Sequence, residues 1–137
     1  MPYLDEQVAD AEQLTNFILE SNKFTTELVN GVAVTKVHYK AFFSTKPHEQ
    51  SVFRMNGLQD DVVEALGRTF VGLQREKPIY GWGRVSAGTV RETVPLAVRA
   101  DEPPPRHAVI HNWPADVEHR RTLAIQLASE AVATKLR

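Results

Sequence analysis

Three consecutive prolines, Pro103 to Pro105, constrain the fold of this chain more than any other part of its sequence. Each proline fixes its own backbone φ angle and has no amide donor, so neither a helix nor an inner strand can pass through the run. We expect a stiff polyproline segment that presents Arg106 and His107 in one direction. The alternative is a plain connector between a strand and the next element, which is what most loops are.

The segments on either side of the prolines have the composition of short strands. Residues 93–99 and 107–113 are rich in strand-favouring residues, and Pro95 suits an edge strand or the start of a strand. Pro114 stands where helices commonly begin. A helix over residues 116–135 is then predicted by apolar residues at helical spacing: Leu123, Ala124, Leu127, Ala128 and Ala131.

The N-terminal part of the chain predicts a helix followed by a hairpin. The helix spans residues 4–20, where apolar residues recur every three or four positions: Leu4, Val8, Ala11, Leu14 and Ile18. The next segment is rich in Val, Thr, Phe and Tyr, and Asn30-Gly31 within it is a strong hairpin signal. The arm after this turn is mixed in polarity on both faces, which favours an edge strand.

The middle of the chain predicts one strand and one helix. Residues 51–55 read as a short strand, and residues 59–74 as a helix with Asp60 and Asp61 in its first turn, where carboxylates suit the helix dipole. Residues 75–88 contain Pro78 and several glycines, so we expect a break there.

These elements predict an α+β fold. Strands and helices do not alternate regularly, as a doubly wound sheet requires. We expect one compact domain over residues 1–137, with a small, mostly antiparallel sheet packed by about three helices. Within it, residues 1–31, which hold the N-terminal helix and the first hairpin arm, could be an addition to the core.

Composition excludes several classes of protein. The chain has 16 Lys and Arg against 17 Asp and Glu, so no overall charge favours a nucleic-acid or membrane partner. It has no cysteine, which excludes disulfides, thiolate metal sites and cysteine nucleophiles. No leader and no span of about 20 apolar residues is visible. We therefore expect a cytoplasmic protein that needs no cofactor.

The candidate binding residues are Arg54, Arg106, His107 and Trp113. Arginine and tryptophan are the residues that most often anchor interfaces. Several arginines could also form an anion-binding mouth, because a guanidinium fits carboxylate or phosphate. The alternative is that each arginine pairs with a surface acid and contributes little.

A metal site formed by His107, His111 and His119 is the weaker alternative for the same region. On a strand, the four-residue spacing of His107 and His111 places both side chains on one face. Five histidines in a chain of this length give such pairs by chance, however, and no specific metal motif is present. We expect no metal.

Two segments resemble a family of short uncharacterised bacterial proteins. "SVFRMNGL" matches its "SVFR-x-x-GL" segment, and "PPPRHA" followed by "WP" matches a later run in the same order. The resemblance covers residues 37–135 and leaves residues 1–31 outside. It implies no catalytic residue. It does suggest small accessory genes of the kind carried with mobile or defence loci.

Three hypotheses about function follow. The first is a non-enzymatic protein-binding module that uses the four candidate residues. The second is a small enzyme acting on a phosphorylated or nucleic-acid substrate, with His107 as general acid or base and Arg54 and Arg106 holding the anion. It requires His107 and Arg54 to open onto one pocket. The third makes the N-terminal helix and the strand after Gly31 a surface for homo-oligomers.

Overall fold

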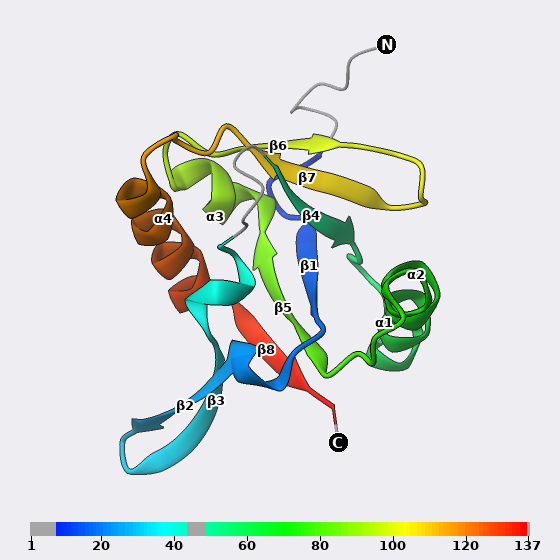
Figure 1. Cartoon of the computed structure of the whole chain (residues 1–137), viewed down its shortest axis with the longest axis horizontal. Helices are drawn as coiled ribbons and strands as arrows, with labels where there is room; N and C mark the ends of the chain where they lie inside the picture. The colour runs from blue at the N-terminus through cyan, green and yellow to red at the C-terminus, as the bar shows by residue number, and fades with distance from the viewer. Residues whose placement is uncertain (1–7, 44–48, 137) are drawn as a thin grey trace.

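The computed structural model describes residues 8–43 and 49–136, which form a six-stranded sheet and a separate two-stranded one. The order in the large sheet is β6-β7-β4-β1-β5-β8, and every neighbouring pair is antiparallel (Figure 1). Its strands are β1 (Gln13–Ile18), β4 (Glu49–Arg54), β5 (Gly81–Ser86), β6 (Ala97–Ala100), β7 (His107–His111) and β8 (Val132–Lys135). The small sheet pairs β2 (Phe24–Val29) with β3 (Val32–Val37). The predicted α+β fold is confirmed.

Helices cover both faces of the large sheet. On one face lie α3 (Ala87–Glu92) and α4 (Val117–Glu130), which pack on a core that includes Leu14 and Ile18. On the other face lies one helical segment made of α1 (Asp60–Gly67), a π-helical stretch (Arg68–Gly72) and α2 (Leu73–Arg75). It packs on a second core, formed chiefly by Phe17, Phe53, Val63, Ile79 and Trp82.

The predicted N-terminal helix is wrong wherever the structure describes it. Residues Gln13–Ile18 form β1, which lies inside the sheet between β4 and β5. Leu14 and Ile18 are four residues apart, a spacing that places two side chains on one face of a helix and also on one face of a strand. Their spacing therefore does not distinguish the two structures. Phe17 is buried on the opposite face, so a strand covered on both sides reads as a continuous apolar run.

The predictions for residues 75–88 and for the C-terminal helix also need correction. The expected break contains β5 and the start of α3. Glycine is needed in β5, because a Cβ on Gly83 would lie 2.7 Å from Val37 Cγ2. Helix α4 ends at Glu130 rather than near 135, and β8 follows it and pairs with β5. Packing against β5, rather than local propensity, decides the structure of this last segment.

The predicted strands over residues 93–99 and 107–113 are shorter than expected, because β6 begins only at Ala97 and β7 ends at His111. Other predictions hold. Asn30-Gly31 forms the turn between β2 and β3, and Ser51 to Arg54 lie in β4. The predicted helix over residues 59–74 is observed, with a π-helical stretch in its second half. Among the residues that the structure describes, no helix combines the length and apolar composition of a membrane span.

Candidate functional site

A hollow opens in the described structure where β1 and β4 separate. These neighbours pair at only two positions, Leu14 with Arg54 and Thr15 with Phe53, whereas β1 pairs with β5 along its whole length. Beyond Thr15 the two strands diverge. A cleft of about 780 Å³ lies there, lined by β1, β4, the 3-10 turns that flank the β2–β3 hairpin, and the helical segment with α2.

The cleft has an aromatic floor. Phe17 from β1 and Phe53 from β4 contact each other with ring centroids 5.8 Å apart. Phe70 from the π-helical stretch stacks on Phe53 at 6.4 Å. Phe17 and Phe53 are buried in the second core and Phe70 is partly buried against it, and all three line the cleft.

Three cationic side chains line the cleft: Lys23, Lys40 and Arg75. Lys23 ends the 3-10 turn Ser21–Lys23, and its Nζ donates to the backbone oxygen of Lys40 at 3.3 Å in the turn Tyr39–Ala41. Within the described chain, none of the three cations forms an ion pair.

Two carboxylates also line the cleft, and only one of them has a cationic partner. Glu49 pairs with Arg99, while Glu20 has no described ion pair. Nearby, burial of His38 and the charges of Lys40 and Lys23 lower the pKa of the His38 ring. The lysine end of the cleft is therefore electropositive.

His107 lies at the edge of the same cleft. Its side chain is 13% exposed, and its ring is edge-on to Phe53 at 5.3 Å. Nδ1 lies 2.9 Å from the backbone oxygen of Asp101 and 3.3 Å from its carboxylate. Because a carbonyl oxygen can only accept, Nδ1 carries the proton, and Nε2 is left as the acceptor of the neutral ring.

Arg54 is at the other end of β4 and does not line the cleft. Its guanidinium binds Glu12 in a bidentate pair, with Nε to Oε1 at 2.8 Å and Nη2 to Oε2 at 3.0 Å. Burial tends to raise the pKa of Glu12, but the bonds from Arg54 and the Ala9 amide, with the charges of Arg54 and Arg91, outweigh it and lower the pKa. Arg91 binds Asp10 beside this pair at 2.6 Å. The prediction that His107 and Arg54 share one pocket is therefore wrong.

Arg106 joins this paired cluster rather than the cleft. Its Nη1 donates to the backbone oxygen of Arg54 at 2.9 Å, and its own carbonyl accepts from the Arg54 amide at 2.7 Å. The side chain is nevertheless exposed. The proline run before it is a turn between β6 and β7, closed by the His107 amide on the Pro104 carbonyl at 3.1 Å. The segment that we expected to be a stiff polyproline stretch is thus a loop that connects two antiparallel strands.

Trp113 was predicted as a surface anchor, but it is buried. It is 8% exposed and packs in the first core, where its Nε1 donates to the Ile110 backbone oxygen at 3.0 Å. The residue lies two positions after the end of β7, and its ring packs in the core on the face of the sheet that carries α4. An aromatic residue beside a loop is often part of the core, and here the core accounts for it.

The three histidines of the metal alternative do not gather. His107 and His111 do lie on one face of β7, as their spacing predicts, but His119 is in the first turn of α4 and exposed. Its amide donates to Asp116, the residue that caps the helix. Over residues 8–43 and 49–136 no three His, Asp or Glu side chains form a group that could hold a metal.

A second candidate surface is the hairpin β2–β3, which we call the arm. It extends from the body of the protein, and its strands pair with each other and with no other described strand (Figure 1). Near its tip Leu28 is 77% exposed and Val32 is 63% exposed. Val29, opposite Val32, is partly exposed as well.

The chain was compared with protein-family models, curated proteins and solved structures, and it matches none of them. The resemblance to a family of short bacterial proteins stays a prediction.

Sequence reasoning missed the cleft residues. Lys23, Lys40 and Arg75 come from three separate segments of the chain, and no sequence motif marks any of them as a binding residue. The sequence did contain a signal for the arm, because the turn at Asn30-Gly31 is flanked by the apolar residues Leu28, Val29 and Val32.

Proposed function

We propose that this protein is a non-enzymatic protein-binding module, and that it binds through the arm to a second copy of itself. The observation that carries the proposal is the exposure of Val29 and Val32, which pair with each other on one face of a hairpin that stands away from the body. An apolar patch on a protruding element marks an interaction site more often than an ordinary surface does.

The backbone of the arm supports the same proposal. A hairpin that belongs to no larger sheet leaves one open edge on each strand, and open edges are templates for strand pairing. Such hairpins are marginal alone, and contact with a further strand or surface stabilises them. The arm is therefore the element that gains most from a partner.

Charge favours a second copy as that partner. The register pairs Glu27 with Val34 and Thr25 with Lys36, so Glu27 and Lys36 lie on one face, together with Val29 and Val32. Neither charge has a described partner within its own chain. A two-fold axis across this face brings Glu27 of one copy towards Lys36 of the other, because symmetric contacts are reciprocal.

The experiment is light scattering coupled to size-exclusion chromatography over a concentration series. One hairpin per chain gives a small contact, so we expect weak association that requires up to about 1 mM protein. The mass should rise from that of one 15.4 kDa chain towards twice that value. Val29→Ser with Val32→Ser should stay at one chain, while Val94→Ser, an exposed valine outside the arm, should behave as wild type.

A charge swap tests the arrangement. Glu27→Lys and Lys36→Glu should each weaken association by about tenfold, and the double variant should restore it. A wild-type chain that stays monomeric throughout, or arm variants that associate as wild type does, would remove the proposal.

An enzymatic role retains one supporting observation, the His107–Asp101 contact at the edge of the cleft. Ser51 lines the same cleft, although no described hydrogen bond joins it to His107. Hydrolysis of p-nitrophenyl phosphate or p-nitrophenyl acetate that is lost in His107→Gln, while the fold is kept, would favour this second candidate.

A further inference from the structure

The cleft between β1 and β4 has the size and lining of a small-molecule site. Its volume of about 780 Å³ falls in the range of roughly 300–1,000 Å³ that such sites occupy. Phe17, Phe53 and Phe70 line it, and Phe70 is the most exposed of the three rings. The site lies between elements of different kinds, two strands and the helical segment, so its walls are set by the tertiary fold.

The charges of the cleft are unbalanced. Lys23, Lys40 and Arg75 face it without a described acidic partner, while Glu20 is the one lining carboxylate that is not engaged. The opposite holds around Arg54 and Arg91, whose charges are matched by Glu12 and Asp10. Glu20 precedes the turn that carries Lys23, so the cleft has more described cationic than acidic side chains without an ion pair, but it is not free of acids.

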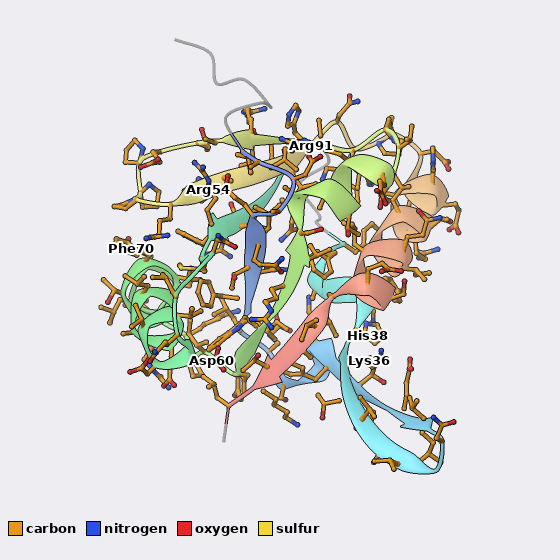
Figure 2. The ribbon with its side chains drawn as sticks, turned by 180° about the vertical axis from the view of Figure 1, so that it is seen from behind. Lys36, His38, Arg54, Asp60, Phe70 and Arg91 are labelled. Carbon is orange, nitrogen blue, oxygen red and sulfur yellow. The ribbon has the colours of Figure 1, made fainter. Side chains whose placement is uncertain are left out.

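Lys23 and Lys40 are two cationic residues of the cleft that contact each other. The Lys23 ammonium is held against the Lys40 backbone, and both charges act on the ring of His38 next to them (Figure 2 labels His38 at the root of the arm). Both ammonium groups are positive, so an anion bound beside these two residues is attracted by each of them.

We propose that the cleft binds a small organic anion whose aromatic or aliphatic body lies on the phenylalanine floor. Its carboxylate or phosphate lies beside Lys23 and Lys40. Arg75, from the helical segment, lines the same cleft and is assigned to a second polar group of a longer ligand. The inference does not depend on self-association through the arm.

The test uses four probes with one ring and different charges. Phenyl phosphate and phenylacetate are the anions, benzyl alcohol is the neutral control and benzylamine is the cation. Isothermal titration at low salt should give anion affinities at least about tenfold above that of benzyl alcohol, and they should fall as salt is added. Inorganic phosphate alone should bind more weakly than phenyl phosphate, because it has no apolar body.

Variants locate the site. Lys23→Gln with Lys40→Gln should weaken phenyl phosphate by about tenfold or more. Lys77→Gln, an exposed lysine that does not line the cleft, should not change its affinity. Ser51→Trp, on the floor strand β4, should fill the cleft and abolish binding of both anions.

Three results would overturn the inference. One is that neither anion binds at millimolar concentration. Another is that benzyl alcohol binds as tightly as the anions. The last is that the double lysine variant or Ser51→Trp, shown by circular dichroism to be folded, binds as wild type does. An acidic peptide that binds while both small anions fail would point to a protein ligand instead and would also reject it.

Discussion

The two ends of the β1–β4 pair differ in almost every respect. At one end the strands are joined by Leu14–Arg54 and Thr15–Phe53, and Glu12 fixes Arg54 through two hydrogen bonds. At the other end the same strands have separated, and the cleft with Lys23 and Lys40 lies between them and their neighbours. Figure 2 shows Arg54 and Arg91 at the end of the molecule far from Lys36 and His38.

The difference shows that charged residues of this chain have two roles, one in the fold and one in the lining of the cleft. Arginines at the joined end are part of the fold, because each is held by an acid of a neighbouring element. Lysines at the open end are held by no described acid, so their charges remain available to a ligand. Residue type alone did not distinguish these roles.

The largest effect should come from the apolar cores of the two ends. Leu14 is fully buried at the joined end, so Leu14→Ala should lower the free energy of unfolding by about 3 kcal/mol. Leu19 lines the cleft and is partly exposed, and Leu19→Ala should cost about 1 kcal/mol or less. Urea denaturation measures both. Equal losses would show that the two ends are equally packed.

A smaller effect should come from the ion pair. Glu12→Gln should lower the free energy of unfolding by about 1 kcal/mol at pH 7. The folded pKa of Glu12 is below its ordinary 4.5, so its contribution is present above that value and is lost as the pH falls through the folded pKa. The difference between wild type and variant should therefore shrink in acid.

The control for this prediction is Glu118→Gln, which removes an exposed pair with Arg121 on α4. Exposed pairs of this kind contribute little, so we expect no clear change in stability. A loss equal to that of Glu12→Gln, or a Glu12→Gln effect that stays constant from neutral to acid pH, would contradict the contrast.

The smallest effect should come from the open end. Lys40→Gln should change stability by no more than about 0.5 kcal/mol, because no described acid depends on this charge. Burial and the charges of Lys40 and Lys23 lower the pKa of His38, so removing one lysine should raise that pKa part of the way back. Titration by nuclear magnetic resonance measures it. An unchanged pKa of His38 in Lys40→Gln, or the same rise in Lys77→Gln, would show that the Lys40 charge does not act on His38.

Much of the fold could be predicted from local patterns. Asn30-Gly31 indicated the hairpin, and the helical spacing of apolar residues after Leu58 indicated the helix that begins at Asp60. The errors were at β1, β5 and β8. Each of these strands takes its structure from its neighbours: β1 is covered on both faces, β5 needs glycine to pass close to β3, and β8 follows a helix whose pattern it continues.

The candidate site could be predicted only in small part. His107 was singled out and does border the cleft, but Arg54 and Trp113 were singled out for chemistry and are used by the fold. A sequence shows which side chains could bind an anion. It does not show which of them already have an acid within reach, since that acid comes from another part of the chain.

The sequence by itself determined the α+β class, the turn at Asn30-Gly31 and the absence of cysteine chemistry, because these depend on residue type and on spacing within one segment. Only the tertiary structure decided that β1 and β4 separate after two pairs and leave a cleft there. That outcome depends on how six strands and the helices on both faces pack together, and no single segment carries the information.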